Sequence, residues 1–328
     1  MNTLFFFSIN NLNTNFFHLF FYVILFLVIE MKKVLIIGST VCDIIMNLDH
    51  LPVTQEDVHP YSQSTRIGGC AFNAAHVIAH MGVPYSFISP IGTGVYGDFV
   101  RKEIKKQNVD TEIFVEGENG SCLCFVEKGG ERTFLSMHGV EYSFDPSWLS
   151  KLDMSEYEYG YVCGLEIEDK DGQCLTDTIC HLPVQFLFAP GPRIMSIQSE
   201  RLNQLLNHGV MLHLNENEAK SITQTNTVEQ AAEKLYQKTG NLVIVTAGHK
   251  GCYIKKEDAF WIESESVNVV NTIGAGDSHA GAFLAALAQG KTLKECAEFA
   301  NKVASKVVST ESSVLDKQMI TEMKNVFG

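Results

Sequence analysis

Short apolar runs alternate with helical patterns along this chain, and that alternation limits its possible folds more than any other feature. The runs expected to form strands lie at 34–39, 85–91, 159–167, 184–189, 210–215 and 242–248. Helical patterns lie between several of them, at 70–82, 97–107 and 227–240. Strands that alternate with helices form a parallel sheet covered on both faces. The sequence therefore predicts an α/β fold with a mostly parallel sheet, in one domain, because no repeat or low-complexity linker divides it.

Two regions break the alternation, because they contain strand patterns with no helix between them. These strands lie at about 44–66 and 119–138, and the second region turns at the Gly129-Gly130 pair, which is typical of a hairpin. Strands without a covering helix predict a small appended sheet. Such a sheet can act as a lid that closes over substrate and excludes water. It is also a candidate surface for a homodimer, and the two roles are compatible.

Composition excludes several classes of function. The chain has 328 residues, of which 45% are hydrophobic, enough to build a large core. Its net charge of −13 argues against a nucleic-acid partner, because phosphate backbones bind basic surfaces. The nine cysteines form no Cys-x-x-Cys pair, which argues against a zinc site and a disulfide framework and favours the reducing cytoplasm.

Residues 1–30 differ in composition from the rest of the chain. The apolar run at 16–29 is shorter than the ~20 residues that span a bilayer. No Lys or Arg precedes it, unlike the start of a secretory signal. The sequence "MKKVLIIGST" (31–40) begins like the first strand of an α/β enzyme. We therefore expect Met31 to be the true start, with a membrane anchor as the alternative.

The stretch "NTIGAGDSHAGAFLAALAQG" (271–290) places glycines and one acid at the start of a predicted helix. The β-branched run at 266–270 before it predicts a strand. The amides of residues 274–276 would then be unpaired donors of a helix N-terminus, which favours an anion. Asp277 opens the predicted helix either as its N-cap or as a general base beside the anion. The turn alone leaves both interpretations open.

A second glycine-rich turn precedes another predicted helix. Gly68 and Gly69 permit close approach of a ligand, and Asn73 follows one helical turn later with an amide that suits sugar hydroxyls. A plain tight turn is the alternative. Asp43 lies just beyond the first strand, where sheet enzymes hold ligands. Its carboxylate could accept two hydroxyl protons, or it could be an ordinary loop residue.

Two further strand ends carry polar residues. Asn215 and Glu218 have hard oxygen atoms that could orient Mg²⁺ through its waters, although acidic helix starts are common. Thr246 and Gly248 suit a phosphate or nucleotide contact.

A Gly-x-Gly-x-x-Gly pattern at 91–98 supports a different function. It follows a predicted strand and precedes a helix, and Glu116 and Glu118 lie about 20 residues beyond it, as in an NAD-binding Rossmann oxidoreductase. That interpretation leaves residues 274–277, Asn73 and Glu218 unexplained.

Taken in order, these motifs resemble those of the PfkB (ribokinase-like) family of ATP-dependent carbohydrate and nucleoside kinases, over nearly all of residues 32–325. "GGCAFN" (68–73) is similar to the family's Gly-Gly-x-x-x-Asn, and "NTIGAGD" (271–277) to its Asp-Thr-x-Gly-Ala-Gly-Asp. Similar pieces are the nucleotide and magnesium motifs "NENE" (215–218) and "TAGHKG" (246–251), and the lid strand "GERTFL" (130–135). The resemblance implies a three-layer α/β/α ribokinase-like sandwich with a small β-sheet lid, spanning 31–328.

The resemblance also implies a role for each matching residue in moving the γ-phosphate of ATP to a sugar hydroxyl. Asp277 would deprotonate the hydroxyl, and the amides of Gly274, Ala275 and Gly276 would hold the phosphoryl charge. The substrate would bind to Asp43, Gly68, Gly69, Asn73 and Glu166. Glu218 would organise Mg²⁺, and the ATP site would be lined by Asn215, Thr246, Gly248, Gly251 and Asn301. A nucleoside, including one like pseudouridine, is the alternative acceptor, and a non-catalytic sugar-binding protein is a third class, against which an intact Asp277 argues.

The chain departs from the family pattern in three places. Asn271 stands where the motif usually begins with Asp, a position linked in ribokinase-like enzymes to a monovalent cation, so a K⁺ requirement is left open. Glu311-Ser312 stands where Gly-Ala is frequent, and Gly94 where Asp or Asn is common. Apart from Arg66 and Arg132, no basic cluster marks a second phosphate site, which favours an unphosphorylated acceptor.

Overall fold

The computed structural model describes residues 32–328, and the expectation for residues 1–30 lies outside the described residues. Eight strands form the main sheet in the order β14-β13-β12-β11-β10-β9-β1-β4. Neighbouring strands from β4 to β12 are parallel, and β13 and β14 add an antiparallel edge. Their bounds are β1 Lys33–Ile37, β4 Tyr85–Ile88, β9 Tyr157–Cys163, β10 Gln185–Ala189, β11 Met211–Asn215, β12 Val243–Thr246, β13 Cys252–Lys255 and β14 Ala259–Ile262.

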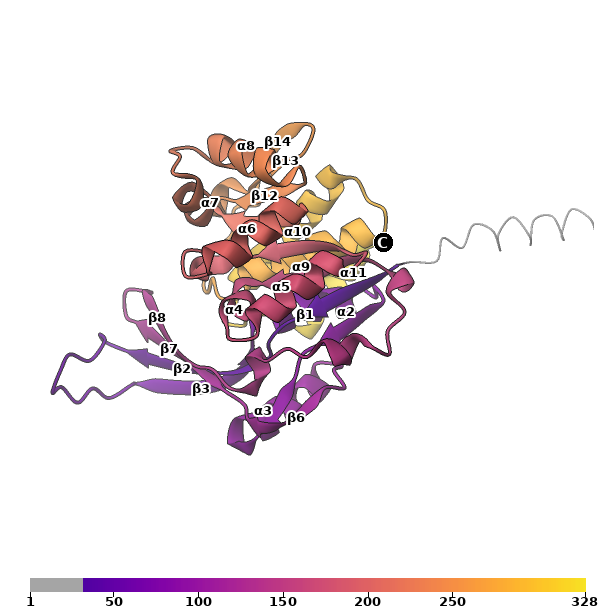
Figure 1. Ribbon diagram of the computed structural model, residues 1–328. Coiled ribbons are helices and arrows are strands. Elements are labelled where there is room, and N and C mark those ends of the chain that lie inside the picture. The colour runs from indigo at the N-terminus through magenta and orange to yellow at the C-terminus, as the bar shows by residue number, and fades with distance from the viewer. Residues whose placement is uncertain (1–31) are drawn as a thin grey trace, which may run out of the picture. The chain divides into compact units, whose positions relative to one another are not determined.

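Helices cover both faces of this sheet (Figure 1). Along β1, Val34 and Ile36 pack into one apolar cluster and Leu35 into the other, because successive side chains of a strand point to opposite faces. The first cluster is completed by α2 (Cys70–His80), α3 (Gly94–Lys106), α9 (Ala275–Ala288), α10 (Leu293–Val308) and α11 (Lys317–Phe327). The second is completed by α5 (Gly172–His181), α6 (Ser199–His208), α7 (Glu216–Thr223) and α8 (Val228–Thr239). The fold is therefore a three-layer α/β/α sandwich, as expected.

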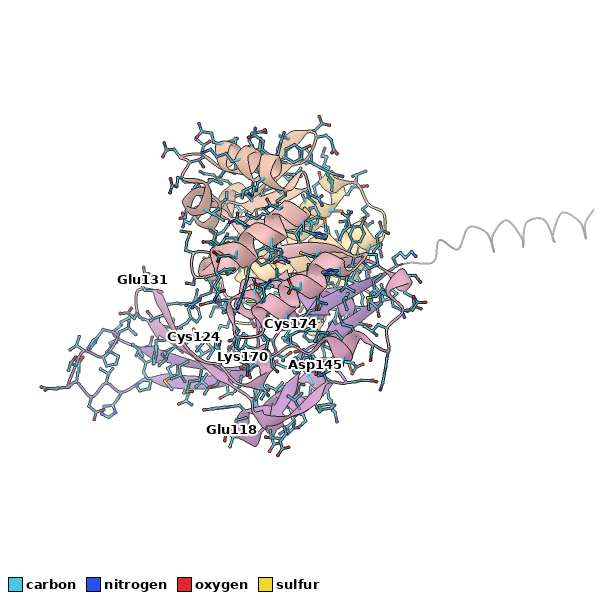
Figure 2. The ribbon with its side chains drawn as sticks, viewed as in Figure 1. Glu118, Cys124, Glu131, Asp145, Lys170 and Cys174 are labelled. Atoms are coloured by element: carbon cyan, nitrogen blue, oxygen red, sulfur yellow. The ribbon has the colours of Figure 1, made fainter. Side chains whose placement is uncertain are left out.

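A four-stranded sheet extends away from the helical layers (Figure 1). Its order is β3-β2-β7-β8, from β2 (Val41–Leu48), β3 (Ser62–Gly68), β7 (Ser121–Glu127) and β8 (Arg132–Met137). The β2–β7 pair is parallel and the other two pairs are antiparallel. Gly130, with a φ of 87°, lies in the turn between β7 and β8, and Glu131 marks that end of the hairpin in Figure 2. Within residues 32–328, no helix has the length and apolar character needed to cross a bilayer.

The strand predicted at 266–270 is wrong. This segment forms no strand, and the Val270 amide donates instead to the carbonyl of Val308, at the end of α10, at 2.7 Å. Three of its valines are at least one-third exposed. A β-branched run becomes a strand when a neighbouring strand can pair with it, and this run borders a helix end.

Two other predicted strands are too long. The run at 159–167 ends as a strand at Cys163 and continues as α4 (Gly164–Glu168). Gly164 permits this turn, because a Cβ there would lie 2.0 Å from the Pro190 carbonyl oxygen. The run at 85–91 divides into β4 and β5 (Ile91–Thr93) around Pro90, which has no amide hydrogen for a strand ladder.

The Gly-x-Gly-x-x-Gly pattern lies outside the main sheet. β5 pairs with β6 (Phe114–Glu118) in a separate two-stranded sheet. A Cβ on Gly97 would lie 2.3 Å from the carbonyl oxygen of Gly92, so these glycines allow α3 to pack closely against β5. The pattern therefore has a packing explanation.

Candidate active site

The predicted site residues gather where the parallel strands of the main sheet end. β11 ends at Asn215 and β12 at Thr246, and these two residues are paired neighbours. Glu166 follows the end of β9, within α4. Open α/β sheets bind ligands at this edge, outside the carboxyl ends of their strands.

Asp277 is the third residue of α9, which begins at Ala275 with Gly274 as its N-cap. Its side chain makes no capping hydrogen bond, so the N-cap interpretation is wrong. Its Oδ2 accepts a hydrogen bond of 3.0 Å from the Asn73 amide, and its Oδ1 lies 3.5 Å from the Tyr161 hydroxyl. The carboxylate is therefore oriented by residues of other elements and is free of its own helix.

The carboxyl groups of Asp277 and Asp43 both have raised pKa values. Burial raises the pKa of Asp277 to about 6, against opposing hydrogen bonds from Asn73 and Cys70. Burial, and then the negative charge of Asp277, raise the pKa of Asp43 to about 7. A carboxylate whose pKa lies near neutrality is a stronger proton acceptor than an ordinary one and still ionises at physiological pH.

The turn before α9 combines a fixed backbone with free amides. Gly274 has a φ of 76°, and a Cβ there would lie 2.3 Å from the Ser313 carbonyl oxygen, so glycine is required. Gly276 has open space around it. The Ala275 amide donates to the Thr272 carbonyl at 3.3 Å, so the prediction that it is a free donor is wrong. The amides of Gly274, Gly276 and Asp277 have no acceptor within residues 32–328. The helix start therefore presents three unpaired donors beside an accessible surface.

The Gly68-Gly69 pair brings β2 against the start of α2. A Cβ on Gly68 would lie 1.9 Å from Asp43 Oδ2, and one on Gly69, whose φ is 105°, would lie 2.5 Å from the Ser39 carbonyl oxygen. Asn73 is buried, and its Oδ1 has no hydrogen-bond partner among the described residues. Because a buried polar atom normally finds a partner, this oxygen is suited to a ligand hydroxyl.

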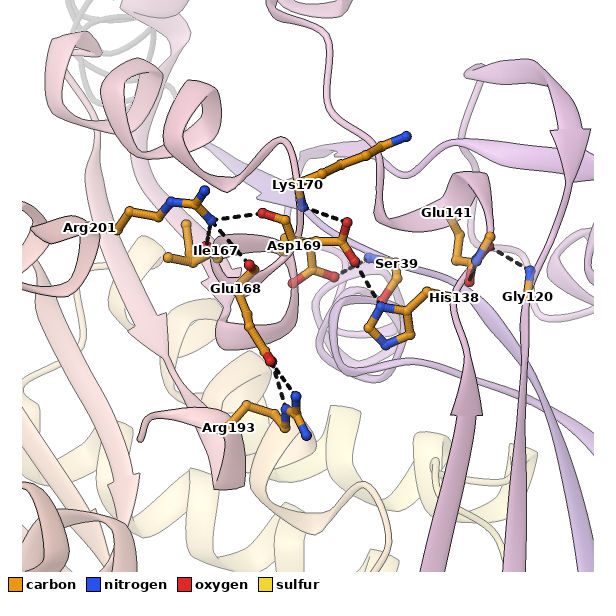
Figure 3. Close-up of polar contacts among 12 residues, drawn as sticks. Ser39, Gly120, His138, Glu141, Ile167, Glu168, Asp169, Lys170, Arg193 and Arg201 are labelled. Carbon is orange, nitrogen blue, oxygen red and sulfur yellow. Dashed lines mark hydrogen bonds and ion pairs between the residues drawn. The ribbon is translucent and has the colours of Figure 1, made fainter. Parts of the chain in front are cut away.

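Glu166 is buried, and its carboxylate accepts hydrogen bonds from two other residues of the protein. Its Oε1 accepts the Ser39 amide at 2.7 Å, and its Oε2 accepts the Cys163 thiol at 2.8 Å. The end of α4 is in turn fixed by Arg201, which donates to the carbonyls of residues 167, 168 and 169 (Figure 3). Because both carboxylate oxygens are engaged, direct contact of Glu166 with substrate stays a prediction.

Asn215 and Glu218 form a capping box at the start of α7. Burial, together with the negative charge of Asp277, raises the pKa of Glu218, despite its hydrogen bond from the Asn215 amide. Within residues 32–328, no group of three or more His, Cys, Asp or Glu side chains could hold a metal ion. Both Glu218 oxygens accept hydrogen bonds from Asn215, at 3.0 and 2.6 Å, so a role of Glu218 in orienting Mg²⁺ through its waters stays a prediction.

The remaining residues predicted to bind nucleotide differ in how much space surrounds them and in whether the protein already binds their side chains. Gly248 has a φ of 57° with open space around it, whereas a Cβ on Gly251 would lie 2.0 Å from the Ile262 carbonyl oxygen. The Asn301 amide donates to the carbonyls of Ile262 and Glu263 at 3.0 and 3.2 Å. Contact of Asn301 with ATP therefore stays a prediction, and its observed contacts are structural.

The sequence analysis did not predict a row of buried side chains joined by hydrogen bonds. His213 Nε2 lies 2.9 Å from His279 Nδ1, and His279 Nε2 lies 3.1 Å from Asn301 Oδ1. Since the Asn301 NH₂ group donates elsewhere, its oxygen accepts, so His279 carries its proton on Nε2 and His213 donates to Nδ1. Burial lowers the pKa of both imidazoles, which keeps them neutral. These hydrogen bonds link β11 to α9 at His279, which is two residues after Asp277. No sequence motif marks them.

The four-stranded sheet contacts the loops around α9. Arg132 of β8 donates to the Thr272 hydroxyl at 2.9 Å. Just after β8, His138 lies 2.8 Å from Asp169 at the end of α4 (Figure 3). The sheet therefore reaches both sides of the site.

The chain belongs to the pfkB family of carbohydrate kinases, because the model of that family matches residues 31–318. The sugar kinase YegV of Escherichia coli (strain K12), itself uncharacterized, is 32% identical over 284 residues, which are 84% of this chain and 88% of that protein. The family makes the chain a phosphotransferase that acts on a hydroxyl group of a sugar or nucleoside. The oxidoreductase interpretation is therefore wrong.

Solved structures confirm the ribokinase-like fold. Adenosine kinase from Sinorhizobium meliloti has a TM-score of 0.78 at 19% identity, covering 90% of this chain and 100% of that one. Ribokinase from Arabidopsis thaliana, complexed with ribose and ATP, has a TM-score of 0.73 at 20% identity, covering 90% of this chain and 99% of that one.

Proposed function

We propose that the protein transfers the γ-phosphate of ATP to a hydroxymethyl-type alcohol of a sugar, with Asp277 as general base. The observation that carries this proposal is a carboxylate with a pKa of about 6 that caps no helix, one residue after an unpaired amide. The acceptor hydroxyl gives its proton to Asp277 while its oxygen bonds to the γ-phosphorus. The bond from that phosphorus to the β-phosphate oxygen breaks, and ADP leaves. The amides at the start of α9 stabilise the charge of the phosphoryl group in flight.

ATP would lie over the ends of β11 and β12, with Thr246 and Gly248 beside it. A bound Mg²⁺ supplies positive charge for the phosphates, and Glu218, near enough to Asp277 for their charges to interact, would hold its waters. Asp43 and Asn73 would bind the acceptor hydroxyls. Asp43 is near enough to Asp277 for their charges to interact, and Asn73 donates to Asp277 through Nδ2 while its Oδ1 has no partner among the described residues.

The rate should depend on pH in the direction set by the raised pKa values. Asp277 accepts a proton only when it is ionised, and its pKa is about 6, with Asp43 about 7. We expect kcat/KM to rise with pH between about 5 and 8 and then level, as one coupled titration of the two carboxyls. A pH series at saturating ATP measures this, and a flat profile down to pH 5 would remove the raised pKa from the mechanism.

A nucleoside acceptor is the second candidate, favoured by an apolar row on the four-stranded sheet. The strand register places Ile45, Cys124 and Phe134 side by side, on the same face as Asp43 and two residues along from it. Cys124 marks this part of the sheet in Figure 2. Phe134 is 53% exposed and lines a pocket with Asp43. An exposed ring there could stack on a base whose ribose is held by Asp43.

Phe134→Ala separates the two acceptors. For a nucleoside we expect KM to rise about tenfold, the value of one lost stacking contact, whereas KM for a free sugar should change little. Phe114→Ala is the matched control, because Phe114 of β6 is 56% exposed and does not line this pocket. An unchanged nucleoside KM in Phe134→Ala would argue against base stacking on this face.

The opposite face of the same sheet supports a homodimer as part of the proposal. Leu135 and Met137 alternate with Phe134 along β8 and are 55% and 47% exposed. Exposed apolar side chains on one sheet face are suited to burial against a second copy. Light scattering of the purified protein measures its molar mass in solution and so tells a dimer from a monomer.

A further inference from the structure

The loop that follows α10 holds a backbone carbonyl that protein donors already bind. The Asn271 amide donates to the Glu311 carbonyl oxygen at 2.8 Å. Arg66 of β3 donates to the same oxygen through Nη1, and its Nη2 lies 3.1 Å from the Glu311 carboxylate. One carbonyl is thus bound by a neutral amide and by a guanidinium.

This position attracts positive charge for a physical reason. The amides of Val270 and Asn271 both bind the Val308 carbonyl, so the segment lies at the C-terminal, negative end of α10. The Glu311 carboxylate adds a negative charge at 3.1 Å from Arg66 Nη2, and Asp43 stands opposite Arg66 in the register of β2 and β3. A cation here is surrounded by acceptors.

A monovalent metal ion does not fit these donors. Asn271 directs its NH₂ group at the Glu311 carbonyl, and its Oδ1 accepts the Ile273 amide at 2.9 Å. A metal ion needs oxygen lone pairs directed at it, and here N–H groups are directed at the oxygen. The K⁺ site that the family resemblance implies is therefore unsuited to K⁺ in this chain.

We propose that the Arg66 guanidinium takes the place of that monovalent cation and positions the catalytic turn. The loop it holds includes Ser313, whose carbonyl oxygen would lie 2.3 Å from a Cβ on Gly274, so the position of the loop sets the start of α9. Because Arg66 belongs to β3, the contact also couples the four-stranded sheet to the turn. The kinetic part of this inference rests on the proposed kinase function.

The first test exchanges the salt. We expect the wild-type turnover number and unfolding temperature to be the same in KCl and in tetramethylammonium chloride of equal ionic strength. Turnover at least about tenfold faster in KCl, or an unfolding temperature raised by K⁺ through binding to the native state, would overturn the proposal.

The second test removes the guanidinium. Arg66→Ala should lower kcat about tenfold, the effect of losing charged hydrogen bonds. Free guanidinium at millimolar concentration, far below its denaturing range, should restore part of that loss. Arg101→Ala is the matched control. Arg101, on α3, also binds one backbone carbonyl, that of Gly92, and one carboxylate, that of Asp98. A purely structural role for Arg66 predicts lower stability without guanidinium rescue, and that result would contradict the proposal.

The unfolding temperature separates this inference from the proposed function. If no acceptor is phosphorylated in either salt, the kinase proposal fails. The proposed role of the Arg66 guanidinium is still tested, because free guanidinium should raise the unfolding temperature of Arg66→Ala more than that of Arg101→Ala. Equal shifts in the two variants would reject it.

Discussion

Asp277→Asn is expected to lower kcat by about 10²–10⁴-fold, the range of a lost general base, while ATP binding is retained. The amide cannot accept the hydroxyl proton, but it has nearly the same shape and can keep the contact with Asn73. Steady-state kinetics and ATP titration of the purified variant measure both quantities.

Stability gives an independent check on the same variant. The folded-state pKa of Asp277 is raised to about 6. The protein therefore loses stability as the pH rises from the unfolded-state pKa of this carboxyl through its folded-state pKa, because the ionised form is disfavoured in the folded protein. Asp277→Asn should therefore unfold at the same or a higher temperature than the wild type at pH 8. Asp316→Asn is the control, because Asp316 caps α11 and Asn caps equally well. Near-wild-type turnover in Asp277→Asn would remove this residue as the base.

Gly274→Ala is expected to lower kcat at least about 100-fold, since misplacing catalytic groups by about 1 Å has that effect. The new methyl group would lie 2.3 Å from the Ser313 carbonyl oxygen and 3.1 Å from the Asn73 amide nitrogen, in a backbone with φ of 76°. The turn would have to move, and both the free amides and Asp277 would move with it.

Gly290→Ala is the matched control at the other end of α9. Gly290 has nearly the same φ, 75°, with no atom within 4 Å of the added Cβ. Both variants should lose about 1–2 kcal/mol of stability through the left-handed backbone, but Gly290→Ala should keep its turnover. If the two variants lost activity equally, backbone strain alone would explain the loss, and the geometry of the turn would not matter.

The sequence predicted the layers of the fold because hydrophobic periodicity records burial on each element. It failed at 266–270, since β-branched residues mark a tendency to extend, whereas a strand also needs a partner that only the tertiary structure supplies. The acceptor side of the candidate site was marked by glycines, and those at 68 and 274 are where a Cβ would collide with Asp43 or Ser313.

Other parts of the site could not be predicted, because their partners are far apart in the chain. Tyr161 reaches Asp277 from β9, and His213 reaches His279 from β11. The roles of Glu166 and Asn301 in ligand binding remain proposals, since one sequence cannot tell whether a buried polar group serves a ligand or the protein. Arg66 was noted as a possible phosphate contact, whereas the structure pairs it with Glu311.

The most direct test of the central claim follows the label from γ-³²P-ATP and Mg²⁺ into a panel of sugars, sugar phosphates and nucleosides, with wild type and Asp277→Asn side by side. The proposed mechanism predicts labelled product from one acceptor class with the wild type, and only background with the variant. Equal transfer by both proteins, or no transfer by a wild type that binds ATP, would contradict it.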